Sequence, residues 1–296
     1  MPHLGEIAGL ATAICWSLTS IVFTIASRRI GALQVNLYRL PAAIFLLGIT
    51  YFLFWGNLDV SVEVIFWLAA SGVVGLAIGD TFLFQAMVII GARLSMILMA
   101  LAPPMAALLA YLFLGEIISP VGIVGIAVTI AGIIWVVAER TPDPEGIKRR
   151  ISFKGVLWGI LAALGQAVGL ILAKKGLNSD IHALLATLIR MLGATAILWP
   201  ITMLSRKVKN PIRIFSNDRS AIKYMILGII FGPYLGVTLS LVSVKYTQTG
   251  IAATLMSTMP VIMIPMVIAI EKEKVSRRAI LGATIAVTGI AILFLR

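Results

Sequence analysis

Residues 98–116 read LMALAPPMAALLAYLFLGE, and residues 255–273 read LMSTMPVIMIPMVIAIEKE. A shift of 157 residues aligns the two stretches and places a proline on a proline and a glutamate on a glutamate. The same shift aligns glycines elsewhere in the chain: Gly75 with Gly232, Gly79 with Gly236, Gly125 with Gly282 and Gly132 with Gly289. The sequence therefore contains an internal repeat.

The composition is that of a membrane protein. Hydrophobic residues make up 60% of the 296 residues, charged residues only 12%, and the mean hydropathy is +1.05, whereas soluble domains carry about 25% charged residues. Runs of about 20 apolar residues are long enough to cross a bilayer. They predict an all-α membrane protein with ten transmembrane helices, near residues 4–27, 33–54, 64–90, 94–114, 120–138, 154–173, 182–204, 222–244, 250–270 and 278–295.

A charged segment divides the chain near its midpoint. Residues 139–150 read ERTPDPEGIKRR, a composition that cannot be buried in lipid and that indicates an exposed linker. We therefore expect a first five-helix repeat at 1–139, a charged linker at 140–153 and a second five-helix repeat at 154–296. Because each repeat has an odd number of helices, the two copies would be inverted around a central cavity, as in many secondary transporters.

The positive charges predict the orientation. Of the 24 Lys and Arg residues, 18 lie in the odd-numbered loops, 4 lie at the termini and in the even-numbered loops, and Arg39 and Arg190 lie within helices. Lys and Arg accumulate in cytoplasmic loops, so both termini are expected outside the cytoplasm of a cell (inner or plasma) membrane. These positions favour anionic lipid headgroups as partners and exclude nucleic acid.

Few residues could hold a cofactor. One Cys, Cys15, permits no intrachain disulfide, and one Cys with two His gives no zinc set. We expect no metal and no cofactor. The first apolar run is too long for a cleaved signal and predicts a retained helix.

One acid interrupts the third apolar run, GLAIGDTFLFQ at 75–85. An ionisable group at bilayer depth costs about 2.5 to 3.5 kcal/mol and normally faces a partner inside the bundle. The helical rise places Asp80 at a depth that the side chain of Arg39 can reach. The pair could fix the register of two helices, or Asp80 could exchange Arg39 for a proton. Both interpretations remain open.

The second half lacks this acid. The shift of 157 aligns Asp80 with Val237, and a shift of 151 aligns Arg39 with Arg190. Arg190 therefore needs an anion or water, and a substrate carboxylate would serve.

Other candidates lie in the middle of apolar runs. Pairs of glycines four residues apart predict close helix packing. Proline removes a backbone donor and frees a carbonyl one turn earlier, so mid-helix prolines predict hinges or cavity walls, or simple kinks; these are Pro103, Pro260 and Pro265, with the free carbonyls near Met99 and Met256. Four polar or aromatic residues would line a cavity or pack: Trp16, Gln85, Gln166 and Tyr234.

Several segments resemble the EamA family of the drug/metabolite transporter (DMT) superfamily: GDTFLFQAMVIIGARLS, the proline-containing run that ends in LGE, and GIVGIAVTIAGIIWV, with their second-half versions. The resemblance implies ten helices in two inverted halves around a central cavity, and the transport of amino acids or other small metabolites, often outward. It places Asp80 and Gln85 on a cavity-facing third helix and Gln166 on the sixth. The family motif matches Gly115 and Glu116, whereas residues 272–273 keep only the acid. From the resemblance we would expect both termini to be cytoplasmic in many relatives, and the charges here predict the reverse.

The sequence thus predicts a secondary active transporter, an exporter or exchanger that works by alternating access on a small-molecule substrate, with protons as a candidate coupling ion. A sugar-phosphate or nucleotide-sugar antiporter is the alternative within the superfamily, since two arginines would also suit phosphate. An intramembrane enzyme is a more remote alternative, because the helices carry no clustered acids, His-rich set or nucleophile with its base. We therefore expect no catalytic residues, and either a monomer or a homodimer.

Overall fold

The computed structural model describes residues 3–56, 58–115, 117–138, 140–142, 148–150, 152–176, 181–247, 249–273 and 275–294. Within these ranges, eight helical segments are long and apolar enough to cross a membrane, and two shorter apolar helices accompany them at Ala102–Phe113 and Thr254–Ile270. The chain is a multi-pass helical membrane protein. The two shorter helices fall on the fourth and ninth apolar runs, which do not form single uninterrupted helices.

The first half begins with α1 (Leu4–Ile30) and α2 (Ala32–Phe54). A run without a loop follows, made of α3 (Val62–Gly72), the π-helical segment η1 (Val73–Gly79) and α4 (Asp80–Met99). This run is broken only at Gly91, where φ is +81° and ψ is 167°, a backbone conformation that favours glycine. The third and fourth expected helices therefore meet at Gly91. The half ends with α5 (Ala102–Leu114) and α6 (Pro120–Val137), and Glu116 between them lies outside the described residues.

The second half repeats this order with the helices α7 (Phe153–Gly176), α8 (Ala183–Leu204), α9 (Pro211–Asn217) and α10 (Arg219–Ile229), the π-helical segment η2 (Ile230–Gly236), and the helices α11 (Val237–Tyr246), α12 (Thr249–Met256), α13 (Met259–Ile270) and α14 (Arg277–Phe294). Both ends of η2 lie 157 residues after the ends of η1. The end of α12 and the start of α13 follow the end of α4 and the start of α5 by the same distance. The sequence repeat is therefore also a repeat of helix interruptions.

Two of the three candidate prolines do not lie where we expected them. Pro103 and Pro260 are each the second residue of a new helix, α5 and α13, and the preceding helices end at Met99 and Met256. The expected mid-helix kinks at these two positions are therefore wrong. Proline is favoured in the first turn of a helix because the backbone amides there have no carbonyl partner within the helix. Pro265 does lie inside α13, where it is exposed.

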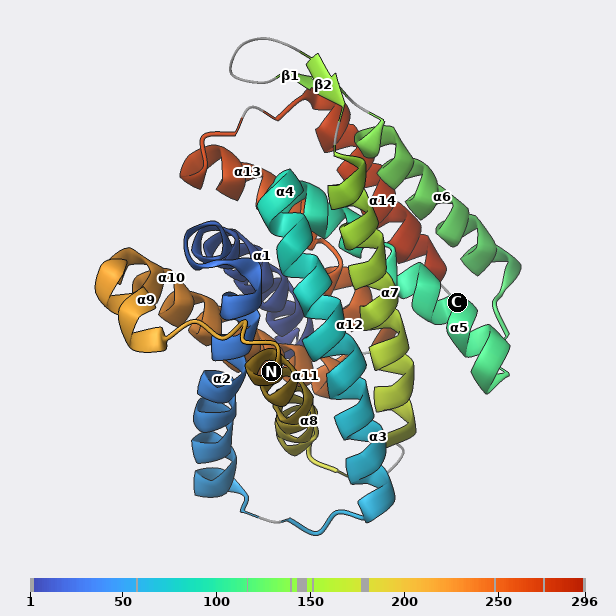
Figure 1. Ribbon diagram of the computed structural model, residues 1–296. Coiled ribbons are helices and arrows are strands. Elements are labelled where there is room, and N and C mark those ends of the chain that lie inside the picture. Colours follow the sequence, from blue (N-terminus) through green and yellow to red (C-terminus); the bar gives the residue numbers. More distant parts are fainter. Residues whose placement is uncertain are drawn as a thin grey trace.

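The linker contains a short hairpin in which β1 (Arg140–Pro142) pairs antiparallel with β2 (Lys148–Arg150). Apart from this pair, the regular secondary structure of the described residues is helical, as expected. Strands β1 and β2 lie at the top of Figure 1, and the end of α2 and the start of α3 lie at the bottom.

Corresponding helices of the two halves pack against each other. A Cβ on Gly125 of α6 would lie 2.7 Å from the carbonyl oxygen of Gly289, and one on Gly132 would lie 2.8 Å from that of Gly282 in α14. These reciprocal contacts run in opposite directions along the chain, so α6 and α14, side by side in Figure 1, are antiparallel. Two further sets of contacts are related by the repeat: α7 packs on α3, η1 and α4, while its counterpart α1 packs on α10, η2 and α11. The contacts follow a two-fold pattern.

The odd-numbered loops meet on one face. In the last turn of α1, Arg28 forms an ion pair with Glu271, 3.7 Å away, and Arg29 forms one with Asp218, 3.0 Å away. Arg93, two residues after the Gly91 break, donates from Nε to Oε1 of Glu273 over 2.7 Å. The ends of these helices at loops one, three, seven and nine therefore share a face. Which side of the membrane this face occupies stays a prediction.

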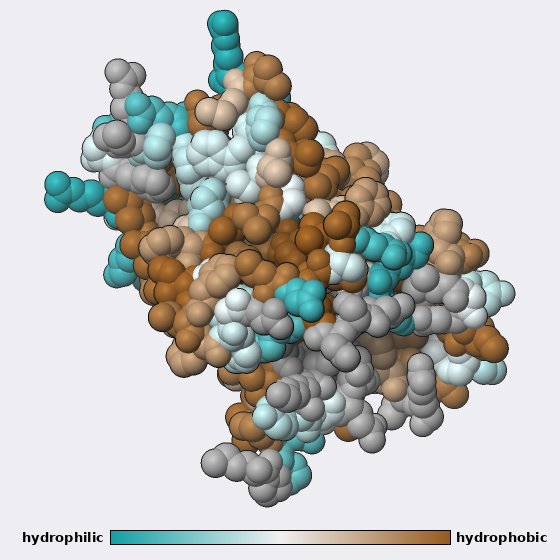
Figure 2. All heavy atoms as spheres, turned by 90° about the horizontal axis from the view of Figure 1, so that it is seen from below, coloured by the Kyte–Doolittle hydropathy of each residue, from teal (hydrophilic) through white to brown (hydrophobic). Residues whose placement is uncertain are grey.

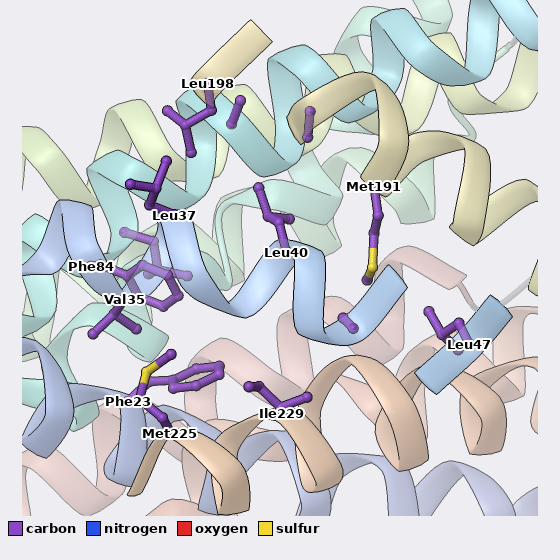
Figure 3. Packing of buried hydrophobic residues seen from close by; sticks show 14 of the residues in the cluster. Phe23, Val35, Leu37, Leu40, Leu47, Phe84, Met191, Leu198, Met225 and Ile229 are labelled. Atoms are coloured by element: carbon purple, nitrogen blue, oxygen red, sulfur yellow. The ribbon is translucent and has the colours of Figure 1, made fainter. Parts of the chain in front are cut away.

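The core lies where α1, α2, α4, α8 and α10 converge (Figure 3), with Phe23 beside Met225 and in edge contact with Phe84, ring centroids 5.5 Å apart. Many large apolar side chains are exposed instead, as a lipid-facing surface requires. Figure 2 shows brown, hydrophobic side chains over much of one face, with hydrophilic ones protruding at its edges.

Candidate functional site

Asp80 follows the π-helical segment η1 directly. Its amide donates to the carbonyl of Gly75, five residues earlier, and its side chain forms an ion pair with Arg39 of α2. Asp80 is 5% exposed and Arg39 is 7% exposed. The expected ion pair therefore forms between two buried groups. π-helical turns often lie at functional sites, and here such a turn immediately precedes the acid.

Asn36 supports both η1 and Arg39. Its amide donates to the carbonyls of Leu76 and Ala77 over 3.1 and 3.2 Å and to the hydroxyl of Thr81 over 2.9 Å, and its Oδ1 accepts from Nε of Arg39 over 3.0 Å. It thereby occupies carbonyl groups of the wide π turn. We did not identify Asn36 from the sequence. The available signal was an amide side chain in an apolar run, one helical turn before the arginine.

Gln166 reaches the acid from the second half of the chain. Its Nε2 donates to Oδ1 of Asp80 over 2.6 Å and to the carbonyl of Gly75 over 3.3 Å. Glycines bring α7 close enough for this contact: a Cβ on Gly165 would lie 2.8 Å from Cα of Gly79, and one on Gly169 would lie 3.0 Å from Cα of Gly75. The close packing expected of these glycine pairs is present. The backbones can approach because neither helix has side chains there.

Arg190 of α8 is the fourth member of the cluster. Its backbone is in direct contact with Gly72 at the end of α3, and its charge interacts with that of Asp80. Its Nε is buried and, among the described residues, has no hydrogen-bond partner. The side chain as a whole is partly exposed. Two arginines and one aspartate leave this cluster with one excess positive charge.

The remaining candidates lie apart from the acid. Thr50 of α2 donates to the hydroxyl of Tyr234 over 3.1 Å, about 16 Å along the helix from Arg39 at 1.5 Å per residue. Trp16 packs on η2, where a Cβ on Gly236 would lie 2.5 Å from its Nε1. Gln85 is partly exposed on α4. No described contact joins these residues to Asp80.

The two halves differ at the site. A shift of 150 residues aligns Gly5 and Gly9 of α1 with Gly155 and Gly159 of α7, and it aligns Trp16 with Gln166. The contact of α7 with η1 contains the amide of Gln166 and the acid Asp80. The related contact of α1 with η2 contains the aromatic Trp16 instead of the amide and Val237 instead of the acid. The polar cluster occupies one of two related positions.

Two hollows are described elsewhere. One of about 480 Å³ lies along α10, between Arg219, Lys223 and neighbouring apolar residues. Another of about 390 Å³ lies between α4, α6 and α7 and is apolar. Neither is lined by the Asp80 cluster. Within the described ranges, no three His, Cys, Asp or Glu side chains gather where they could hold a metal ion.

Comparisons with known proteins were made for the whole chain. The EamA-like transporter family model matches residues 3–138 and again residues 153–295. No curated protein matches the chain. Among 26 matching chains of solved structures, the crystal structure of one protein is 14% identical, with a TM-score of 0.67 over 97% of this chain and 95% of that one. At that identity the likeness concerns the fold alone.

Proposed function

We propose that this chain, which belongs to the EamA-like transporter family, is a secondary active transporter that exports or exchanges small metabolites such as amino acids across the cell membrane. The family belongs to the DMT superfamily and consists of transporters. The substrate, the coupling ion and alternating access are our inference. Catalysis has no part in the proposal.

The proposed architecture is ten membrane crossings in two inverted five-helix repeats, 1–139 and 154–296, around a central cavity. The antiparallel packing of α6 on α14 and the recurrence of helix interruptions after 157 residues support it. In this reading α5 continues the crossing begun by the end of α4, and α13 continues that begun by α12. Interrupted helices at matching points of two repeats commonly flank transporter binding sites.

One observation carries the proposed mechanism. The carboxylate of Asp80 holds Arg39 of its own half and Gln166 of the other half. If the halves rock against each other to expose the cavity alternately, at least one of these contacts must change. The cycle would therefore alter the surroundings of a buried acid.

Such an acid can serve as a coupling site. When Asp80 loses contact with Arg39, its protonated form becomes the more stable one, because an unpaired carboxylate is strongly disfavoured away from water. Asp80 would then exchange Arg39 for a proton once in each cycle. The competing account is that the pair only holds α2 and α4 in register.

Counterflow in proteoliposomes tests the transport function itself. Purified protein is reconstituted, the vesicles are loaded with unlabelled amino acids, sugar phosphates or nucleotide sugars, and entry of the labelled compound is followed. We expect trans-stimulated entry for at least one amino acid and none in protein-free vesicles. Entry stimulated only by sugar phosphates or nucleotide sugars would favour the alternative antiporter, and no stimulation by any compound would contradict the proposal.

A further inference from the structure

One side of α10 combines basic and apolar side chains around a hollow. The residues that line this hollow of about 480 Å³ are Arg219, Ile222, Lys223, Ile226 and Leu227. Their spacing of three and four residues places them all on one side of the helix. The other side of α10 is buried against the bundle, at Ala221, Met225, Gly228 and Ile229. The hollow therefore faces away from the core, and α10 lies at the edge of the bundle in Figure 1.

The basic and apolar residues occupy different ends of the hollow. Arg219 is the first residue of α10 and Lys223 follows one turn later, whereas Ile226 and Leu227 lie farther along the helix. At 1.5 Å per residue, the hollow extends about 12 Å from Arg219 to Leu227. Residues 219–240 form one of the candidate membrane spans, which begins at loop seven. The basic end therefore lies at the membrane surface and the apolar end lies within the bilayer.

The two cations are not balanced by a described acid. The nearest acid along the chain, Asp218, accepts hydrogen bonds from Nη1 of Arg29 at both carboxylate oxygens, over 3.1 and 3.0 Å. Arg219 and Lys223 are both exposed, and neither belongs to any ion pair among the described residues. The basic end of the hollow thus carries two uncompensated positive charges.

The placement of these charges is unfavourable for α10 itself. Like charges four residues apart on a helix repel each other. The helix dipole favours negative charge in the first turn, and Arg219 lies there. An anion bound between the two side chains would relieve both effects. Because the hollow continues along apolar side chains, the matching ligand is an anion with a long apolar chain.

We propose that this hollow binds one anionic phospholipid, with its phosphate between Arg219 and Lys223 and an acyl chain along Ile226 and Leu227. Anionic headgroups attract basic residues close to the membrane surface. The acyl chain covers apolar surface that the protein leaves open, since Ile226 is 51% exposed. The site is separate from the Asp80 cluster, and the inference does not depend on transport or on its substrate.

The first test uses the full chain in a neutral detergent and the rise in unfolding temperature on lipid addition. The probes are dioleoyl phosphatidylglycerol, dioleoyl phosphatidylcholine with the same chains, and glycerophosphoglycerol, the anionic headgroup without chains. We expect phosphatidylglycerol to stabilise the wild type more than phosphatidylcholine, and glycerophosphoglycerol to have no effect. In Arg219→Gln/Lys223→Gln the affinity for phosphatidylglycerol should fall about 30-fold, because each basic residue near an anionic lipid contributes about fivefold.

Lys154→Gln/Arg277→Gln is the matched control. It removes the same charge from two exposed side chains near the starts of α7 and α14, and neither residue lines a described hollow. This variant should bind phosphatidylglycerol nearly as the wild type does. Without lipid, Arg219→Gln/Lys223→Gln should unfold no earlier than the wild type, because the repulsion within α10 is gone. Loss of binding is then separate from loss of folding.

A second test locates the lipid. Phosphatidylglycerol with a photoreactive diazirine in one acyl chain is added to the wild type and irradiated, and the labelled peptides are identified by mass spectrometry. We expect the label on residues 222–227, and much less of it there in Arg219→Gln/Lys223→Gln. The inference is wrong if the label is absent from α10, if phosphatidylcholine or the free headgroup stabilises equally well, or if the two double variants lose equal affinity.

Discussion

Asp80 and Gln166 join the two halves of the chain through one short hydrogen bond, 2.6 Å from Nε2 of the amide to Oδ1 of the carboxylate. The residues are 86 positions apart, and the glycine contacts between α7 and η1 allow them to meet. This hydrogen bond stabilises the cluster around Asp80. Any movement of one half of the chain against the other must either preserve it or break it.

Replacing Gln166 should therefore destabilise the protein. Gln166→Met keeps a similar length but leaves Oδ1 of Asp80 and the carbonyl of Gly75 without this donor. We expect the free energy of unfolding in detergent to fall by about 1.5 to 3 kcal/mol, as for other hydrogen bonds to charged groups. Gln85→Met is the control, because no described hydrogen bond involves that side chain. Equal losses in the two variants would contradict the stabilising role of the contact.

The ion pair between Arg29 and Asp218 should make stability depend on pH at the acidic end. The hydrogen bond from Arg29, aided by the backbone amide of Ala221, lowers the pKa of Asp218 below its ordinary value of 3.8. A lowered pKa in the folded state stabilises the protein above the ordinary pKa, and this contribution is lost as the pH falls through the folded value.

Asp218→Asn isolates this charge, because asparagine can still cap the start of α10. The wild type should unfold at a higher temperature than the variant near pH 6, and the difference should shrink toward about pH 3. A difference that stays constant over this range would show that the charge is not responsible.

The proposed cavity predicts accessible positions at the two helix interruptions. Met99 and Met256 are both partly exposed. Cysteines placed there, in a Cys15→Ala background, should react with small water-soluble thiol reagents, and substrate should slow the reaction. A cysteine at Met263, which is 0% exposed in α13, should remain unreactive. If the first two positions are also inert in every condition, the cavity does not lie at the interruptions.

The orientation can be measured with reporters. The concentration of Lys and Arg in the odd-numbered loops predicts that a C-terminal reporter active only in the cytoplasm is silent, while the same reporter inserted between Pro142 and Lys148 of the linker is active. The reverse pattern would show that both termini are cytoplasmic, without affecting the fold.

The sequence predicted those features that depend on spacing along a helix. Arg39 and Asp80 could be paired because each interrupts an apolar run, and the helical rise per residue places them at depths that an arginine side chain can bridge. The glycine pairs predicted close packing for the same reason. The family match then confirmed the resemblance that these segments suggested.

Other features depend on contacts between distant segments or on local backbone changes. Nothing in the sequence indicated a π-helical turn before Asp80, so the roles of Asn36 and Gln166 in binding its carbonyls and carboxylate were not foreseen. Pro103 and Pro260 were assigned to helix interiors because the apolar runs continue through them, although hydropathy does not distinguish one helix from two joined end to end. The break at Gly91, by contrast, lies in the gap that the sequence left between its third and fourth apolar runs.

The central claim is that Asp80 exchanges Arg39 for a proton during transport, and Asp80→Asn tests it most directly. Asparagine keeps the shape and part of the hydrogen bonding but cannot take up or release a proton. In proteoliposomes the variant should still exchange labelled substrate for unlabelled substrate, but it should lose accumulation driven by a pH gradient. If folded Asp80→Asn protein accumulates substrate along a pH gradient at the wild-type rate, Asp80 only holds Arg39 in place and the claim is wrong.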